Sequence, residues 1–313
     1  MLEDSKVVFC ENASHFAVCL DHSFFIYQTK PLKLKFKKEF MNSLIDRIVL
    51  SHDGNIVAFS SIETIKGNNQ YKLYIWSNYF GEAEGELDFS EEIMNLVMRG
   101  RHLLIILEKS ICVYDIDRKV IHFDMVTHHN PFGVGDLSSQ SDSPLIAVCG
   151  LVPGSVRISI MPSDNSPVFI SAHNHALAMI RFTNDSSLIA TASETGTLIR
   201  IFDCANGTLL GVFRRGTLTS RILSMSFSKN NNFLVVVSET GTAHMFHMEE
   251  RDPNESDPPR AASKLAIGRI SSVDTSFLTD NDLVLISSTG FIHEINVKKS
   301  SIQVISKTFI LSH

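Results

Sequence analysis

The chain has 313 residues, of which 44% are hydrophobic and 20% are charged, and its formal net charge is −6. This balance is typical of a globular protein with a substantial core and argues against intrinsic disorder. Because acids outnumber bases, any anionic partner must be met by a local basic patch, and a general nucleic-acid coat is excluded.

The cysteines and the start of the chain bear on its location. Five cysteines, an odd number, include no Cys-x-x-Cys pair, which fits a reducing compartment better than a disulfide framework. The opening residues are acidic and lack the apolar core of a secretion signal. No apolar stretch approaches the ~20 residues that span a bilayer. We therefore expect a soluble, cytoplasmic protein.

Strand–turn–strand patterns follow one another along the first half of the chain. They are found at residues 16–28, 57–76, 103–116 and 145–160. After the first of them, Lys33, Lys35 and Lys37 alternate along a short run and share one face of a predicted strand. Such lysines either protect an edge strand from pairing with other chains or make a weak contact with an anionic surface.

A closer repeat occupies the second half of the chain. LIATASETGTLIRIFD (188–203) aligns with LVVVSETGTAHMFHM (234–248), and LVLISSTGFIHEINV (283–297) is a third copy. Each copy is an apolar strand, a tight turn and a second strand with alternating side chains. The unit at 177–213 reads as four β-rich runs, and its Asn206-Gly207 pair predicts a type I′ hairpin.

Equivalent positions in the second strands of these patterns define a period. They are Tyr27, Trp76, Tyr114, Ser159, Phe202, Phe246 and Ile295. Their spacing averages about 45 residues, the period of WD40-type blades. One four-stranded blade cannot bury both of its faces, whereas seven blades packed radially can. The sequence therefore predicts an all-β, seven-bladed β-propeller with four-stranded antiparallel blades, formed by residues 1–313 as a single domain.

An arginine pair stands out within the predicted propeller. Arg214 and Arg215 follow a strongly patterned unit, and on an outer strand their side chains point to opposite sides. Hydroxyl-rich turns lie in the unit before the pair and in the unit after it. Arginine forks, hydroxyl groups and turn N–H groups together suit phosphate. The alternative is that the pair only keeps an exposed rim soluble.

The same segments resemble a known family. TASETGTLIRIFD, then FRRG, then SFSKNNNFLVVVSETGTAHMF are similar to the PROPPIN family of seven-bladed, phosphoinositide-binding propellers, and the likeness extends through residues 127–156. The resemblance implies binding of phosphatidylinositol 3-phosphate and phosphatidylinositol 3,5-bisphosphate. It also implies a peripheral location on phagophore, endosomal or vacuolar membranes. The implied partners are autophagy proteins, such as a large lipid-transfer protein or the conjugation machinery.

The resemblance assigns one headgroup site to each arginine. The first site would consist of Arg214, Ser193, Thr197 and His173. The second would consist of Arg215, Ser238, Thr242 and His244. Each histidine has an alternative structural role, His173 as a buried turn residue and His244 as a filler of a strand position. If they do bind phosphate, their protonation near pH ~6.5 would raise affinity as the pH falls.

Two features depart from the family pattern. Thr195 stands where the family often has lysine, which removes a cation from the first site. Family members also carry a long loop that enters the membrane, and the corresponding segment here, 249–263, is acidic and proline-rich with no large apolar residue. Such a segment cannot bury an apolar face in lipid and is repelled by anionic headgroups. We expect no insertion of this loop into a membrane.

Other functional classes find little support. A protein-interaction scaffold with weak or lost lipid binding is the main alternative, and Thr195 and the acidic segment favour it. For an enzyme or a metal protein the candidates are His128-His129 and His173-x-His175. Adjacent strand residues point apart, and His-x-His lacks a third ligand, so we expect no catalytic site, no metal and no cofactor.

Overall fold

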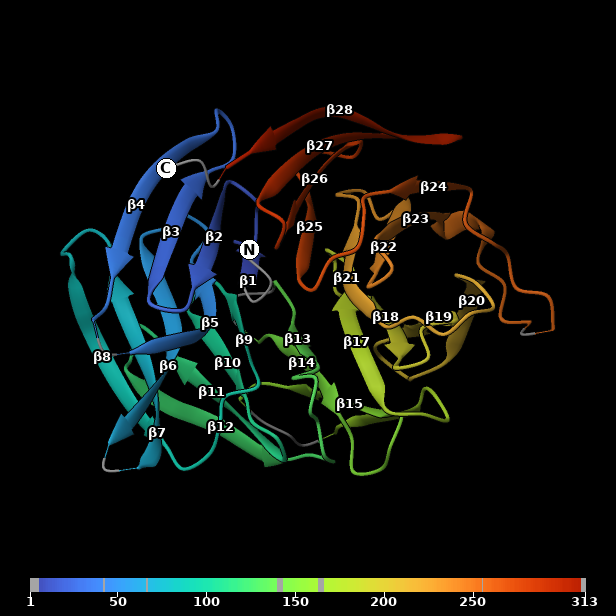
Figure 1. The fold of residues 1–313 in the computed structure, drawn as a ribbon. Helices are drawn as coiled ribbons and strands as arrows, with labels where there is room; N and C mark the ends of the chain where they lie inside the picture. Colours follow the sequence, from blue (N-terminus) through green and yellow to red (C-terminus); the bar gives the residue numbers. More distant parts are fainter. Residues whose placement is uncertain are drawn as a thin grey trace.

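The described residues form twenty-eight strands, arranged as seven four-stranded antiparallel sheets around a common centre (Figure 1). The computed structural model describes residues 6–41, 43–65, 67–139, 143–162, 166–254 and 256–310. The start of the chain, on which the expected lack of a secretion signal rests, lies outside these residues. The predicted seven-bladed propeller is confirmed. We name the sheets blades 1 to 7 in chain order.

Each of the first four blades is built from consecutive strands. Blade 1 contains β1 (Lys6–Phe9), β2 (His15–Leu20), β3 (Ser23–Gln28) and β4 (Lys33–Glu39). Blade 2 contains β5 (Leu44–Leu50), β6 (Ile56–Ile65), β7 (Asn68–Ser77) and β8 (Glu82–Phe89). Blade 3 contains β9 (Asn95–Arg99), β10 (His102–Ile106), β11 (Ser110–Asp115) and β12 (Val120–Val126). Blade 4 contains β13 (Gly135–Leu137), β14 (Leu145–Cys149), β15 (Ser155–Ile160) and β16 (Val168–Ser171).

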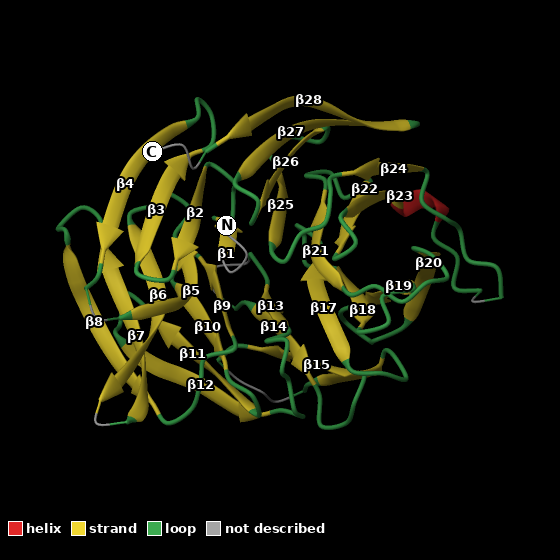
Figure 2. Ribbon diagram, viewed as in Figure 1, coloured by secondary structure: helices red, strands yellow, loops and turns green. Residues whose placement is uncertain are grey.

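The last three blades follow the same plan. Blade 5 contains β17 (Leu177–Phe182), β18 (Leu188–Ser193), β19 (Leu198–Asp203) and β20 (Leu209–Arg214). Blade 6 contains β21 (Ile222–Phe227), β22 (Phe233–Ser238), β23 (Thr242–His247) and β24 (Ser263–Ala266). Blade 7 contains β25 (Val273–Phe277), β26 (Asp282–Ser287), β27 (Phe291–Lys298) and β28 (Ser301–Phe309). A 3₁₀ turn, η1 (Met248–Glu250), is the only helix among the described residues (Figure 2).

The repeat is present in the structure as the sequence predicts, with one local exception. All seven predicted equivalent positions lie on the third strand of their blade, from Tyr27 on β3 to Ile295 on β27. The type I′ turn predicted at Asn206-Gly207 is wrong. That turn needs positive φ at both residues, and only Gly207 has it. The hairpin closes instead through a wider turn, in which the Gly207 N–H donates to the Asp203 carbonyl at 2.9 Å.

The core lies between neighbouring blades. The first strands of the blades contact one another around the ring, β25 with β1 included, and surround an axial cavity of about 260 Å³. Outward from this axis, apolar side chains of adjacent blades interdigitate, as Ile199 and Phe213 of blade 5 do with Leu234 and Phe246 of blade 6. Alternate residues on a strand face opposite blades, so these strands are apolar on both faces.

In the described part of the chain, the ring closes without an exchange of strands between its ends. Blade 7 is formed there by β25 to β28 and blade 1 by β1 to β4. They are joined by an apolar cluster, by the Tyr27 hydroxyl donating to the Ile310 carbonyl at 3.0 Å, and by the Phe9 N–H donating to Asp274 Oδ2 at 2.9 Å. Burial raises the pKa of the Asp274 carboxyl, against the opposing effects of Arg181 and of the hydrogen bonds from Phe9, Thr275 and Ser224. Closure therefore depends on side chains.

In three blades, a glycine in the turn between the second and third strands lets that turn pack closely against the linker to the next blade. Gly154, Gly196 and Gly241 all have positive φ, between 59° and 75°. A Cβ atom built on them would lie 1.9 Å from the His173 carbonyl oxygen, 2.0 Å from that of Ser220 and 1.8 Å from that of Gly268, respectively. No other residue fits these positions without a shift of the backbone.

Candidate functional site

The arginine pair lies at the end of the outermost strand of blade 5. Arg214 is the last residue of β20 and pairs with Leu198, while Phe213 pairs with Ile199 and packs against blade 6. Because successive side chains alternate, Arg214 faces away from blade 6 and Arg215 faces toward it. The structure thus places the two cations in different environments.

Arg215 is held rigidly although it is buried. Its side chain is 7% exposed, its Nε donates to the Gly196 carbonyl at 2.8 Å, and its Nη2 donates to the Leu218 carbonyl. Both acceptors are neutral, and among the described residues no carboxylate forms an ion pair with this guanidinium. Burial lowers the pKa of Arg215, although a guanidinium stays protonated. The site therefore carries a fixed positive charge.

His244 lies on the blade 6 side of Arg215. It is a buried residue of β23, and its register partner is Lys264 on β24. Burial, then Lys264 and then Arg215 lower the pKa of His244 to about 4. Sequence reasoning missed Lys264, because only the register of β23 against β24 places this isolated lysine beside His244.

His173 has a different environment, in the linker between blades 4 and 5. The Arg200 Nη1 donates to His173 Nδ1 at 2.7 Å, and the Nε2 of the same ring bonds the Thr191 hydroxyl at 3.0 Å. A guanidinium only donates, so Nδ1 accepts and Nε2 carries the proton. These contacts favour the structural role for His173. They also bring Arg200 of β19 to the same face of blade 5 as Arg214, an arrangement that sequence reasoning missed.

The serines of the two turns are engaged in the turns themselves. Ser193 bonds the Thr195 hydroxyl at 2.9 Å, and Ser238 bonds the Thr240 hydroxyl at 3.0 Å. An equivalent bond of 2.7 Å joins Ser287 to Thr289 in blade 7, where no arginine pair follows. The serine–threonine bond is therefore a property of the turn.

Thr197 and Thr242 are the more accessible hydroxyl residues of the two predicted sites. Both are half-buried, whereas Ser193 and Ser238 are buried. The Thr197 carbonyl also accepts the N–H of Arg215 at 2.9 Å, which fixes the turn against the end of β20. Of the predicted hydroxyl groups, these two are the better placed to reach a bound phosphate.

The acidic segment 249–263 lies along the open edge of blade 5. The Val212 N–H donates to the Asp252 carbonyl and the Arg214 N–H donates to the Pro259 carbonyl, both at 2.8 Å. Figure 2 shows the loop in green between η1 and β24, on the side where β20 lies. Residue 255 is outside the described part of the segment. The structure therefore places this segment, which carries the exposed Asp252 and Asp257 as well as Arg260, along the strand that ends at Arg214, an arrangement that sequence reasoning did not foresee.

The low pKa of His244 predicts how stability depends on pH. His244 and His293 both have pKa values of about 4, below the ordinary value of 6.5, mainly because they are buried. Between these pH values the unfolded chain binds protons that the folded chain does not, so stability falls as the pH drops from about 6.5 toward 4. We expect the melting temperature of the variant His244→Gln, His293→Gln to fall less steeply over this range than that of the wild type.

Parallel melting curves against pH for the two proteins would contradict this assignment. The same low pKa means that His244 is neutral at pH 7 before any ligand binds, so in the free protein it adds no positive charge beside Arg215.

The chain is similar in sequence to a known protein family and to a curated plant protein. Residues 58–286 match the family model described as PROPPIN. The chain is 30% identical over 272 residues to "Autophagy-related protein 18e" of Arabidopsis thaliana, an alignment that covers 84% of this chain and 70% of that protein.

Solved structures share the fold. The structure of Kluyvelomyces marxianus Hsv2 matches with a TM-score of 0.82 at 20% identity, over 99% of both chains. A structure of KlAtg21 in complex with the coiled coil of AgAtg16 also matches with a TM-score of 0.82 at 20% identity, over 97% of this chain and 98% of that one. No helix in the described part of the chain is long and apolar enough to cross a membrane.

Proposed function

The chain belongs to the PROPPIN family, and from this membership we propose that it binds phosphoinositides and acts as a membrane-recruited effector or scaffold in autophagy. Its ligands under this proposal are phosphatidylinositol 3-phosphate and phosphatidylinositol 3,5-bisphosphate. The protein is then peripheral on phagophore, endosomal or vacuolar membranes, and residues 1–313 act as one propeller domain. We propose no catalytic role.

One observation carries the proposal, the fixed charge of Arg215. Among the described residues this buried guanidinium bonds two carbonyls and no carboxylate, so it lacks the counter-charge that usually accompanies a buried cation. A phosphate group supplies that charge and accepts two donors of the planar fork at once. Lys264 and the half-buried Thr242 lie on the same strand pair as His244 and add an ammonium group and a hydroxyl group to the proposed site. The second headgroup site is thus proposed at Arg215, Thr242, His244 and Lys264.

The first site is proposed on the opposite face of blade 5. Arg214 and Arg200 supply two cations there, and the second of them offsets the missing lysine at Thr195. Thr197, whose carbonyl accepts the Arg215 N–H, is the predicted hydroxyl residue held against the end of β20. Two modest sites on one rigid body reinforce each other through effective concentration, so the propeller resides on a membrane even when each site alone is weak.

Protein partners are proposed by analogy. KlAtg21, which shares the fold, was solved with the coiled coil of AgAtg16. We propose that this chain likewise recruits autophagy proteins, through blades that do not face the membrane. A scaffold with weak or lost lipid binding is the second candidate, and the acidic loop beside Arg214 favours it.

Flotation with liposomes tests the proposal directly. Vesicles containing phosphatidylinositol 3-phosphate or 3,5-bisphosphate are compared with vesicles in which phosphatidylserine supplies the same surface charge. Specific binding gives flotation with the phosphoinositide vesicles at physiological salt, where non-specific attraction is screened. Equal flotation with both kinds of vesicle, or with neither, would favour the scaffold.

The acidic loop is expected to weaken this binding. Neutralising Asp252→Asn with Asp257→Asn removes two exposed acids from the segment beside Arg214. We expect flotation affinity to rise about three- to tenfold at low ionic strength and the gain to vanish at high salt. The control Glu82→Gln with Asp88→Asn makes the same charge change on β8 of blade 2. An equal gain in the control would show a general charge effect.

A further inference from the structure

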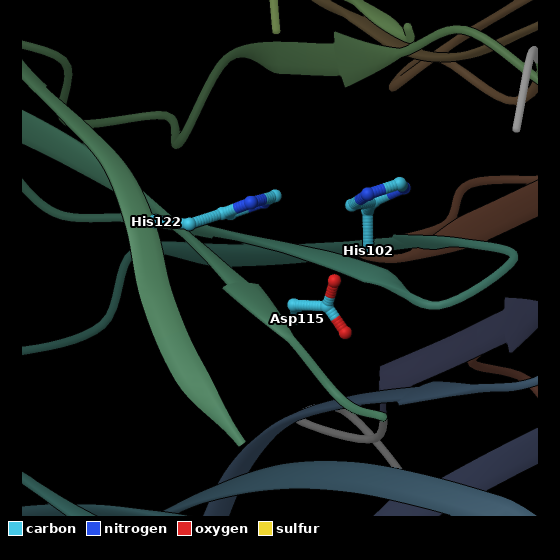
Figure 3. Close-up of side chains that lie close together, drawn as sticks. All are labelled: His102, Asp115 and His122. Atoms are coloured by element: carbon cyan, nitrogen blue, oxygen red, sulfur yellow. The ribbon is translucent and has the colours of Figure 1, made fainter. Parts of the chain in front are cut away.

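Blade 3 brings together three side chains that suit a metal ion. They are His102 on β10, Asp115 on β11 and His122 on β12, and one nitrogen or oxygen atom from each lies within 4.8 Å of the other two. Figure 3 shows the two rings side by side with the Asp115 carboxylate next to them. The histidine pairs singled out from the sequence, at 128–129 and 173–175, do not take part.

Strand register and a bulge create this cluster. His102 and Asp115 are direct partners across β10 and β11. On β12 the register shifts, because Val113 pairs with Phe123 while Tyr114 pairs with Ile121, so His122 is the extra residue. A bulge redirects a side chain, and here the rings of His122 and His102 lie 5.4 Å apart, within 5° of parallel.

The cluster contains polar atoms that the described residues leave without hydrogen bonds. Asp115 is fully buried, and its Oδ1 accepts the Arg118 N–H at 2.9 Å, whereas its Oδ2 accepts no hydrogen bond and lies within ion-pair distance of two arginines. His122 Nε2 is a buried atom without a hydrogen-bond partner among the described residues. A buried imidazole nitrogen of this kind is rare and calls for an explanation such as an ion.

We propose that His102, Asp115 and His122 bind a divalent transition-metal ion of the Zn²⁺ type, with a fourth position left to water. Two imidazoles and one carboxylate form the ligand set of many zinc sites with an open position. Tetrahedral ligands with bonds of about 2.0–2.1 Å lie about 3.3 Å apart, so binding draws the most widely separated of these atoms together by up to about 1.5 Å. His122, half-buried on the outermost strand, has the freedom to make this movement.

Two arginines set the strength of the site. Arg101 Nε lies 3.3 Å and Arg118 Nε 3.8 Å from Asp115 Oδ2, and their side chains are 37% and 66% exposed. Both compete with a metal for the carboxylate, and both can turn outward into solvent. If arginine competes with the metal, the affinity for the metal changes in opposite directions in two kinds of variant. Removal of the Arg118 side chain raises the affinity, and removal of a ligand lowers it.

Metal titration of tag-free protein, stripped with a chelator, tests the proposal. We expect about one equivalent of Zn²⁺ by calorimetry, and visible absorption from Co²⁺ typical of a four-coordinate site with nitrogen ligands. His122→Ala weakens binding by about tenfold or more, and Arg118→Gln strengthens it several-fold while the backbone N–H to Asp115 remains. The control His128→Ala with His129→Ala leaves binding unchanged.

Circular dichroism and melting temperature confirm that each variant is folded. The absence of stoichiometric binding would overturn the proposal, as would wild-type affinity in His122→Ala. Weaker binding in Arg118→Gln would also overturn it, because the arginine would then support the site instead of competing with the metal. Calorimetry and Co²⁺ absorption both use the protein without lipid, so their results do not depend on the proposed function.

Discussion

The double substitution Arg214→Thr with Arg215→Thr is expected to abolish flotation with phosphatidylinositol 3-phosphate vesicles. Each arginine serves a different face of blade 5, so the pair removes a principal cation from both proposed sites at once. Loss of two linked sites costs far more than loss of one, because the surviving site no longer benefits from a high effective concentration. We expect a decrease in bound protein of about 100-fold or more.

The two single variants separate binding from folding. Arg215 donates hydrogen bonds to Gly196 and Leu218, so Arg215→Thr also lowers the free energy of unfolding, by about 1–3 kcal/mol. Arg214 is the last residue of β20 and is half-buried, and we expect its replacement to leave the free energy of unfolding nearly unchanged. Flotation and urea unfolding of both variants measure the two effects. A control with Lys109→Thr and Lys298→Thr has the same net charge as the double variant and is expected to float like the wild type.

Retention of specific flotation by the double variant would place lipid binding elsewhere on the propeller. If urea unfolding shows that the double variant loses flotation because blade 5 is unfolded, the headgroup contact is not tested by that variant. Arg214→Thr then tests it, because this variant removes a charge without removing a hydrogen bond of the turn.

The largest effect on stability is expected from Gly241→Ala. Its Cβ would lie 1.8 Å from the Gly268 carbonyl oxygen, and its φ of 75° is unfavourable for alanine. The turn and the linker after blade 6 cannot both keep their positions, so we expect a loss of about 3–5 kcal/mol and a fall in melting temperature of about 10 °C. Thermal unfolding followed by circular dichroism measures it.

Gly81→Ala is the matched control for this variant. Gly81 has a φ of 72°, but no atom lies within 4 Å of the point where the alanine Cβ would stand. The control therefore incurs only the backbone cost, about 1 kcal/mol. Equal losses in the two variants would show that close packing against the linker contributes nothing beyond conformational strain.

The fold could be predicted because its signals are local. A Ser-x-Thr-Gly turn between two apolar strands is written in contiguous residues, as at Gly196 and Gly241, and its recurrence reports the blade period. The split of Arg214 and Arg215 to opposite faces follows from strand alternation alone. No knowledge of distant contacts is needed for either inference.

The missed features all depend on register or on backbone pairing between distant segments. Lys264 lies beside His244 only because β24 pairs with β23 across an intervening loop. His122 joins His102 and Asp115 only because β12 carries a bulge at that residue. The acidic loop follows β20 through main-chain bonds from Val212 and Arg214, which leave no side-chain signature. Sequence patterns do not encode these choices.

The closure of the ring by side chains alone has a consequence for biosynthesis. In the described structure every blade is built from consecutive strands, so blade 1 can form during translation without a strand from a later part of the chain. Blades can then form one after another as they emerge, each on the face of its predecessor. The contacts of Tyr27 with Ile310 and of Phe9 with Asp274 form last, and translation of the final blade becomes the step that turns an open spiral of sheets into a ring.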